Sequence, residues 1–533
     1  MTRHPAVATA TTADPSRWQA VIAALLAVGA GLAVLVLGDL SLKYRVAIVG
    51  GVVATGFLLL SPDRRIWSLI FWVLVMPLSV EKVFYVAPAV WSGFVAQSVT
   101  INAADAFLVL LALFLLVKSL LTPQQVFYWP KAATAWLLFL AWAGTSYAMH
   151  LGYLHDGLVS ASPLALLRAV RILVFIVLVH SAIRSRGDVL LVLGAVLAIV
   201  LLESALVGLS YVTGHVFNFT ELTGGNPVLA LQKYAGSGGG SGGLLVRGSG
   251  TLGSTNDTAK FETFYSLILL AFFGVRNAFF RTLALCALLA AGMAILLSFS
   301  RGAWLSFALA LVLAFALLLR RGAISQRAWL TGAGVGILVV IALGALATPI
   351  MDRLSNKGDE GATASRLRMF HVAFDLASAY PIIGVGPGEY AQAGLQLESP
   401  QYGTAENVAL GSKPIAPLVG RLDVVSLARP GQEDLRLPLP VHNRFLLVLA
   451  QMGAIGLLLW LLLYRVFLRD ALRCLKSRDR FYRFVGVAGL AYLLAALVYM
   501  NVDLFDDTKS IEVLLFVPVV VTAVARLVRE EGA

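Results

Sequence analysis

Charged residues are scarce in this sequence of 533 residues. Asp, Glu, Lys and Arg make up only 13% of it, whereas hydrophobic residues make up 59%. A soluble globular chain is about half apolar and about a quarter charged. Because the apolar residues also form repeated runs of roughly 18 or more, the composition indicates membrane-spanning helices, while a membrane β-barrel would show alternating segments of about ten residues. We therefore predict an all-α, polytopic transmembrane helical bundle.

Cysteine is almost absent. Cys286 lies inside an apolar run and Cys474 in a basic loop, so a disulfide framework is not supported. A basic domain is also missing, because the net charge of +12 is carried by short loops between apolar runs. This pattern disfavours nucleic-acid binding and reports helix orientation instead. A further apolar run follows the first one where a cleavage site would stand, so we expect no signal peptide.

The apolar runs predict about 12–14 membrane spans. The candidate runs are 20–37, 45–61, 66–80, 103–121, 132–149, 164–183, 188–212, 258–275, 279–298, 303–319, 328–348, 443–465, 483–500 and 511–528. The run 66–80 is short for a span and also suits a re-entrant or interfacial piece.

Basic loops set the predicted orientation. The segment 464–483 is the most basic, and short basic loops stay on the cytoplasmic side of a membrane. Counting spans from this segment places both termini in the cytoplasm and the long polar segments on the outer side. The predicted organisation is a cytoplasmic tail (1–19), transmembrane helices (20–348) with an outer loop (214–257), a long outer loop bearing short helices (349–442), C-terminal transmembrane helices (443–528) and a cytoplasmic tail (529–533).

Two polar positions stand at the predicted outer ends of spans. Asn256, in "GTLGSTND", suits either a helix N-cap or a binding role, and the sequence leaves both open. Arg301, in "SFSRGAWLSF", joins two spans through a tight turn. An arginine whose stem lies along the apolar surface is the simpler interpretation. However, arginine is disfavoured on the outer side, and we therefore favour an anion ligand.

The long outer loop contains the stretch "RLRMFHVAFDLASAYPIIGVGPGEY". We predict an amphipathic helix over 364–378, ended by Pro381 and followed by a tight glycine-rich turn. Arg366 and Phe370 are four residues apart and share one face of this helix. The turn does not match the dinucleotide-binding pattern, which needs a strand before it and a helix after it.

A histidine marks the point where the long loop returns to the membrane. His442 and Asn443 precede the apolar run "RFLLVLAQMGAIGLLLWLL", and the simpler interpretation is an interfacial cap with Asn443 as N-cap. Imidazole can also accept a proton near neutral pH. Two arginines on the same side, Arg301 and Arg366, have the forked geometry that holds a diphosphate. Together these residues fit glycosyl transfer from a diphosphate-linked donor, although composition alone does not separate this activity from transport of anionic lipids.

The order of these motifs resembles the O-antigen ligase and O-antigen polymerase superfamily of bacterial envelope proteins. The resemblance rests on "GTLGSTN", "SFSRGAWL", "RLRMF" with "YPIIGVGPGEY", and "HNRFLLVLAQMGAIGLLLWLL", and it covers residues 245–465. It implies a multi-pass protein of the bacterial inner membrane with a periplasmic active site. The implied donor is an undecaprenyl-diphosphate-linked glycan, and the implied acceptor is lipid A core or another lipid-linked glycan.

The resemblance also implies roles for single residues. His442 would be the general base of an inverting glycosyltransferase that needs neither metal nor cofactor. Arg301 and Arg366 would bind the diphosphate. Phe370 stands where the family often has tryptophan, which keeps an aromatic ring. Supporting roles would fall to Asn256, Asn443, Arg368 and Phe370.

Three alternatives remain open at this point. A metal-dependent lipid-linked glycosyltransferase would use acidic residues of the first outer loop, where Asp39 stands alone. A transporter or flippase of lipid-linked oligosaccharides would have internal repeats and charges inside its spans. No clear repeat is present, but Arg168, Arg171 and Glu203 are candidate charges within spans, with structural pairing as the simpler interpretation. A non-catalytic component of a polysaccharide export system would explain the hydropathy alone.

Overall fold

The computed structural model describes most of the helical part of the chain. The described residues are 63–78, 81–86, 98–123, 126–150, 162–214, 247–320, 360–390, 440–503 and 508–532, with a few isolated positions between them. Four segments of the prediction lie wholly or largely outside the described residues. They are the spans 20–37, 45–61 and 328–348 and the loop residues 394–439.

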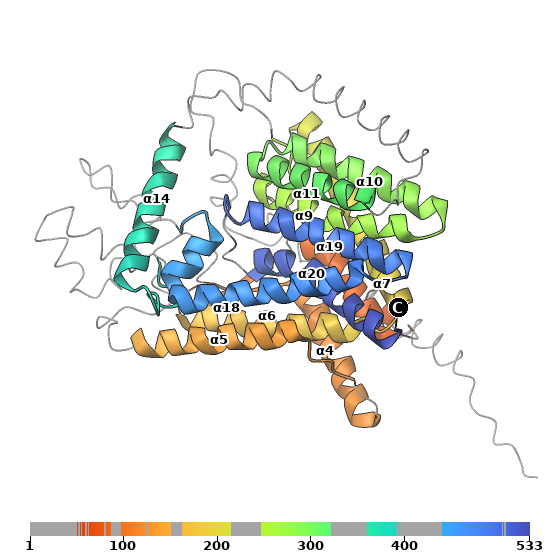
Figure 1. The fold of residues 1–533 in the computed structure, drawn as a ribbon, viewed down its shortest axis with the longest axis horizontal. Coiled ribbons are helices and arrows are strands. Elements are labelled where there is room, and N and C mark those ends of the chain that lie inside the picture. The colour runs from red at the N-terminus through yellow and green to blue at the C-terminus, as the bar shows by residue number, and fades with distance from the viewer. Residues whose placement is uncertain are drawn as a thin grey trace, which may run out of the picture.

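The described residues form a helical bundle, and eight of their helices are long and apolar enough to cross a membrane. This confirms the predicted all-α, polytopic class. The main helices of Figure 1 are α3 (Arg64–Val75), α4 (Ala103–Leu121), α5 (Lys131–His150), α6 (Ser162–Ala182), α7 (Arg186–Thr213), α9 (Thr255–Leu267), α10 (Ala278–Leu297), α11 (Arg301–Arg320), α14 (Glu360–Ala379), α18 (Arg444–Leu475), α19 (Arg480–Tyr499) and α20 (Thr508–Glu530).

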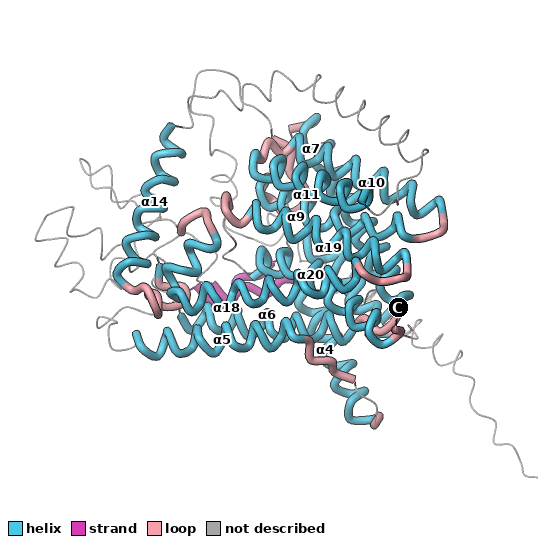
Figure 2. The backbone as a smooth tube through the Cα atoms, viewed as in Figure 1, coloured by secondary structure: helices cyan, strands magenta, loops and turns pink. Residues whose placement is uncertain are grey.

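The predicted run 66–80 is not a span. Helix α3 has 12 residues and is about 18 Å long, which is shorter than the roughly 30 Å of a bilayer core. A 3-10 turn (Met76–Leu78) and strand β1 (Glu81–Val86) follow it. Strand β1 pairs antiparallel with β2 (Ser98–Asn102), drawn in magenta in Figure 2. The sequence analysis missed this sheet because two short strands have no hydropathy signal of their own.

Helix α20 forms the centre of the bundle and packs against α6, α9, α18 and α19. Its residue Glu512 is buried and accepts hydrogen bonds from Arg171 of α6, with Nε to Oε1 at 3.0 Å and Nη2 to Oε2 at 3.1 Å. The same guanidinium lies 2.6 Å from the carboxylate of Asp105 on α4. These three charges inside the bundle are thus paired with one another, because an unpaired charge would be costly there.

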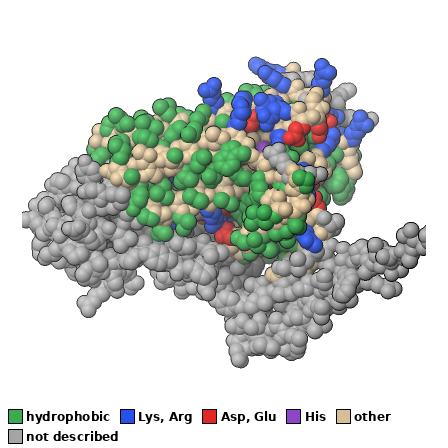
Figure 3. All heavy atoms as spheres, turned by 90° about the horizontal axis from the view of Figure 1, so that it is seen from below, with side chains coloured by type: hydrophobic (Ala, Val, Ile, Leu, Met, Phe, Trp, Pro, Cys, Tyr) green, Lys and Arg blue, Asp and Glu red, His purple; other side chains and the backbone are tan. Residues whose placement is uncertain are grey.

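The outer surface of the bundle suits contact with lipid. Large apolar side chains stand exposed on several helices, among them Val109, Leu120, Val312 and Leu458. Figure 3 shows a face dominated by hydrophobic side chains, with Lys and Arg side chains gathered mainly at one edge. Hydrocarbon chains cover such apolar residues without cost, so this surface is expected of helices inside a membrane.

We expect Arg171→Leu to destabilise the bundle by about 3–5 kcal/mol, because it removes one partner of the ion pair with the buried Glu512 carboxylate. Unfolding of the purified protein in detergent, followed by helical circular dichroism, measures the change. Arg465→Leu on the exposed side of α18 is the control, with an expected change within about 0.5 kcal/mol. Equal stability of the two variants would show that the Arg171 pairs contribute nothing.

Candidate active site

Helix α18 is broken close to its start. Gly453 has φ +64° and ψ −171°, which interrupts the helical hydrogen bonds. Residues 380–390, here called the docked loop, pack into this break. Three backbone hydrogen bonds join the two segments, Val385 N–H to Ala450 C=O at 3.0 Å, Gly386 N–H to Gln451 C=O at 2.9 Å and Ala454 N–H to Pro381 C=O at 2.8 Å. Each segment thus satisfies backbone groups that the other leaves open.

Two glycines make this close approach possible. Gly453 adopts a backbone conformation that is almost confined to glycine. A Cβ atom at Gly453 would collide with the carbonyl of Ile382, and one at Gly384 would collide with the backbone of Gln451. Gly384 also has positive φ, at +74°. The docked loop and the helix break therefore require glycine on both sides of the contact.

Two further helices hold the docked loop. Ser146 of α5 donates a hydrogen bond to the carbonyl of Ile383 at 3.0 Å. Ser162, at the start of α6, donates from its hydroxyl to the carbonyl of Pro387 at 2.8 Å. The buried Glu389 accepts from the backbone N–H of Ser162 at 3.0 Å. The loop is thereby fixed to α5, α6 and α18, and it fixes the short first part of α18 in turn.

His442 immediately precedes this first part of α18. Asn443 is the N-cap, as predicted, and its side-chain oxygen accepts from the N–H of Leu446 at 2.9 Å. The His442 side chain is one-third exposed, and its Nδ1 lies 3.5 Å from Oδ1 of Asp503. Because Nδ1 faces the carboxylate, Nε2 is directed away from Asp503. This arrangement matches a base whose orientation is set by a third group.

Asp503 is in turn held by Lys260 of α9. Nζ of Lys260 lies 3.1 Å from Oδ2 of Asp503 and 3.1 Å from Oδ1 of Asp257, and its side chain is only 7% exposed. Burial by itself raises the pKa of Asp503, but the Lys260 ammonium and then His442 outweigh burial and lower it. The Asp503 carboxylate therefore stays ionised at neutral pH and can act as an acceptor for His442.

The start of α18 is tied to the connection between α19 and α20. Arg444 donates from its backbone N–H to the carbonyl of Met500 at 2.7 Å and from Nη1 to the carbonyl of Phe505 at 2.7 Å. The Asn443 amide donates to Oδ1 of Asn501 at 3.2 Å. These contacts keep the connection opposite the imidazole. The sequence analysis did not connect the acidic residue of this connection with His442.

Arg301 lies beside the same connection. It is the first residue of α11, it is exposed, and the tight turn before it contains Phe299 with φ +52°. The next residue, Gly302, approaches the connection so closely that a Cβ there would lie 2.7 Å from Cγ2 of Val502. Because Val502 precedes Asp503 in the chain, Arg301 begins its helix next to the segment that faces the histidine.

Asn256 is not a helix cap. The N-cap of α9 is Ser254, whose hydroxyl accepts from the N–H of Asp257, and Asn256 lies in the first turn. Its side-chain oxygen accepts from Nη2 of Arg247 at 3.0 Å, while Nε of Arg247 donates to the carbonyl of Ser298 at 2.8 Å. Sequence reasoning missed Arg247, although an arginine on the predicted outer side is the signal that singled out Arg301.

Helix α14 covers the first part of α18. The predicted amphipathic helix 364–378 is present, and its buried face includes Met369 and Leu376, which pack with Val441 and Leu447 near His442. Pro381 follows the helix and the glycine-rich turn comes next, as expected. The loop helix thus reaches the candidate site through apolar packing.

The remaining predicted site residues lie on α14. Arg366 is exposed, and Phe370 is half-buried against the apolar cluster that joins α14 to α18. Arg368 lies in the helix, but its side chain is outside the described residues. The contacts between described side chains therefore link His442 with Asp503 and Lys260, whereas Arg366 is connected to them only through the packing of its helix.

A metal centre has no support from side-chain clustering in the described parts of the chain. Within them, no group of three or more His, Cys, Asp or Glu side chains is arranged to hold a metal ion. The ionic contacts of the site instead combine one imidazole, two carboxylates and one ammonium.

Comparison with known proteins gives one family match. The model of the O-antigen ligase family matches residues 285–411, about a quarter of the chain, and this segment contains Arg301, Arg366 and the docked loop. The match supports the O-antigen ligase and polymerase superfamily and, in general terms, glycan transfer by a membrane protein. No curated protein matches the chain.

We expect Gly453→Ala to destabilise the protein by at least about 1–3 kcal/mol, because the conformation is nearly exclusive to glycine and a Cβ would meet the carbonyl of Ile382. Gly194→Ala is the matched control, since α7 leaves open space around that position and alanine favours a helix. Thermal unfolding of both variants in detergent measures the difference. A Gly453→Ala protein as stable as the control would contradict the tight docking of the loop.

Proposed function

We propose that the chain transfers a glycan from an undecaprenyl-diphosphate carrier to an acceptor hydroxyl on the periplasmic face of the bacterial inner membrane. The observation that carries this proposal is the contact between His442 and Asp503 beside a segment that matches the O-antigen ligase family. The acceptor is lipid A core in a ligase or another lipid-linked glycan in a polymerase.

In the proposed reaction His442 is the general base. Its Nε2 accepts the proton of the acceptor hydroxyl while the hydroxyl oxygen attacks the anomeric carbon of the donor sugar. The bond between that carbon and the diphosphate oxygen breaks, and the diphosphate leaves with the electron pair. Attack from the opposite side inverts the anomeric centre. Asp503 orients the imidazole and stabilises the imidazolium that forms, as its ionised carboxylate 3.5 Å from Nδ1 allows.

Arginines stabilise the leaving diphosphate in this proposal. Arg301 and Arg366 are exposed, and each carries a planar, positively charged guanidinium group. Arg301 lies beside the connection between α19 and α20, which faces His442. Arg366 lies on α14, the helix that covers the first part of α18. A guanidinium placed near the leaving oxygens stabilises negative charge that develops in the transition state.

The charges inside the bundle favour this activity over transport. Arg171 is paired with Glu512 and Asp105, and Glu203 accepts hydrogen bonds from the backbone and hydroxyl of Thr251. These partners support structural roles for Arg171 and Glu203, two of the three charges that suggested an ion or substrate pathway.

We expect His442→Ala to abolish transfer while leaving folding intact, because it removes the base but not the N-cap of α18. The measurement is the glycan profile of cells that lack the gene and are complemented with wild type, His442→Ala or the control His371→Ala, whose imidazole is exposed on α14. Comparable amounts of each protein in the membrane fraction are required. A normal profile with His442→Ala would overturn the assignment of the base.

The same profile distinguishes the two acceptors. Long chains that remain on the lipid carrier beside unmodified lipid A core indicate a ligase. Single repeat units without long chains indicate a polymerase.

Replacement of Arg301 or Arg366 by Gln should lower the transfer rate by about 10²–10³-fold, the effect of removing one preorganised charge-stabilising donor. Turnover of a lipid-linked donor by the purified variants measures this loss. Arg465→Gln, exposed on α18, serves as the control for loss of an arginine. Unchanged turnover would exclude that arginine from the site.

A further inference from the structure

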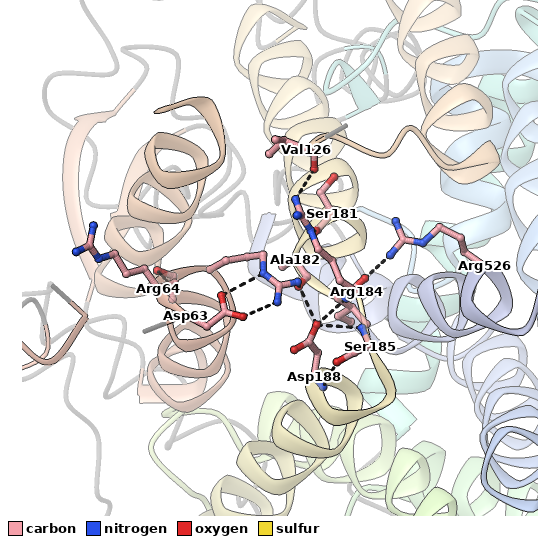
Figure 4. A network of polar contacts seen from close by, with 12 residues as sticks. Asp63, Arg64, Val126, Ser181, Ala182, Arg184, Ser185, Asp188 and Arg526 are labelled. Carbon is pink, nitrogen blue, oxygen red and sulfur yellow. Dashed lines mark hydrogen bonds and ion pairs between the residues drawn. The ribbon is translucent and has the colours of Figure 1, made fainter. Parts of the chain in front are cut away.

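A second polar cluster lies at the opposite end of the bundle. Helix α6 starts at Ser162, which contacts the docked loop, and ends at Ala182, while α20 starts shortly after Asp503 and ends at Glu530. Helices of this length extend about 30 Å, roughly the thickness of a bilayer core. The ends of α6 and α20 therefore lie at the other membrane face, which the basic loops predict to be cytoplasmic. Figure 4 shows the cluster there.

The carboxylates of the cluster are already engaged. Asp188 accepts hydrogen bonds from the backbone N–H groups of Arg184 at 2.7 Å and Ser185 at 3.1 Å, as part of the cap of α7. It also lies 3.0 Å from Nη1 of Arg65, and Asp63 lies 2.6 Å from Nη2 of the same residue. Asp63 thus serves Arg65, and Asp188 serves both Arg65 and the start of α7. Figure 4 labels both carboxylates.

Arg184 has backbone carbonyls as its hydrogen-bond partners. Its Nη2 donates to the carbonyl of Val126 at 2.9 Å and its Nε to that of Ser181 at 3.4 Å. Burial, and then the neighbouring positive charge of Arg65, lower the pKa of Arg184. Carbonyls satisfy donors but do not neutralise charge, so positive charge accumulates at this end of the bundle.

Arg526 of α20 is the least satisfied member of the cluster. It is 6% exposed, it donates from Nη2 to the carbonyl of Ile183, and its guanidinium lies 3.8 Å from the ring centre of Tyr128. Its Nε and Nη1 are buried and have no hydrogen-bond partner among the described residues. Among these residues, Arg526 forms an ion pair with Glu530, which is half exposed. The distance from Nε to Oε1 of Glu530 is 3.6 Å, which is too long for a hydrogen bond.

A second unsatisfied nitrogen lies on α6. The Nδ1 atom of His180 is buried with no hydrogen-bond partner in the described part of the chain, and the residue is 2% exposed. His180 also interacts electrostatically with Arg526 and Arg529. A guanidinium does not escape burial by losing its proton, so an anion that brings several acceptor oxygens would satisfy Arg526.

The segment over the cluster has the aromatic residues of a membrane interface. Phe127 and Trp129 are exposed, at 37% and 54%, on either side of Tyr128. Aromatic side chains gather at headgroup depth in membrane proteins, because their apolar rings and polar atoms suit the boundary. Phospholipid phosphates lie at this same depth, so a lipid headgroup is the anion that we expect to reach Arg526.

We propose that Arg526, with Arg184 and His180, forms a phosphate-binding site at the end of α6 and α20, and that in the membrane it holds the headgroup of an anionic phospholipid. The phosphate displaces the half-exposed Glu530 from Nε of Arg526 and accepts hydrogen bonds from Nε and Nη1. Basic pockets between helices at this membrane face bind anionic headgroups by the same charge complementarity. The site is independent of the proposed glycan transfer.

Native mass spectrometry of the full-length protein tests the proposal, after extraction from bilayers with equal amounts of phosphatidylcholine and phosphatidylglycerol. Wild type should retain phosphatidylglycerol in preference to phosphatidylcholine. Arg526→Gln should reduce this preference by about tenfold or more, as expected for loss of one charge-assisted hydrogen bond. Arg526→Lys should be intermediate, because it keeps the charge but loses the planar fork.

Arg483→Gln is the matched control. Arg483 lies at the start of α19 and donates to the carbonyls of Ser477 and Arg478 in its own turn. It should retain phosphatidylglycerol like wild type. A general effect of lost positive charge would lower retention equally in Arg483→Gln and Arg526→Gln, and would overturn the proposal.

A second arm separates the two sources of phosphate. Inorganic phosphate, compared with chloride at equal ionic strength, is added to the protein in bilayers of phosphatidylcholine, and the unfolding temperature is measured. Stabilisation of wild type but not of Arg526→Gln indicates free phosphate as the ligand, while retained phosphatidylglycerol without this shift indicates the headgroup. If wild type shows neither preference nor shift, the proposal is wrong, whether or not Arg526→Gln folds.

Discussion

The position of the candidate base depends on the contact between the docked loop and the break in α18. A continuous helix would bury all its backbone groups internally and leave no place for the loop. Because Gly453 interrupts the helix, three backbone hydrogen bonds join it to a segment that also binds α5 and α6. The short helical piece after His442 is consequently held from several sides, and the imidazole is presented by a rigid support.

Hydropathy predicted the helices well and the site only in part. The run 279–298 became α10 (Ala278–Leu297), because long apolar stretches in lipid have few alternatives to a helix. The break at Gly453 was not predicted, since the apolar pattern continues through it. Asp503 was missed as the partner of His442 because the two residues are far apart in sequence, and no local pattern reports such a contact.

The two ends of the bundle place charge differently. At the site, Asp503 lies between Lys260 and His442, so one carboxylate is shared by a fixed ammonium and a titratable ring. At the other end, Arg184 and Arg526 have mostly carbonyl partners. In the first arrangement each charged group has a partner of opposite charge, which suits orientation of the candidate base. In the second, nitrogens of Arg526 remain as donors for an external anion.

The polarity of α9 has a consequence for biosynthesis. This helix buries Lys260 and Glu262, and each charged residue costs about 2.5–3.5 kcal/mol when a single helix enters the bilayer. Its neighbours include α19 and α20, which are synthesised more than two hundred residues later. Lys260 therefore meets Asp503 only after the C-terminal helices have entered the membrane. The contact between Lys260 and Asp503 is completed last, so a ribosome that stops early leaves an inserted but unassembled chain.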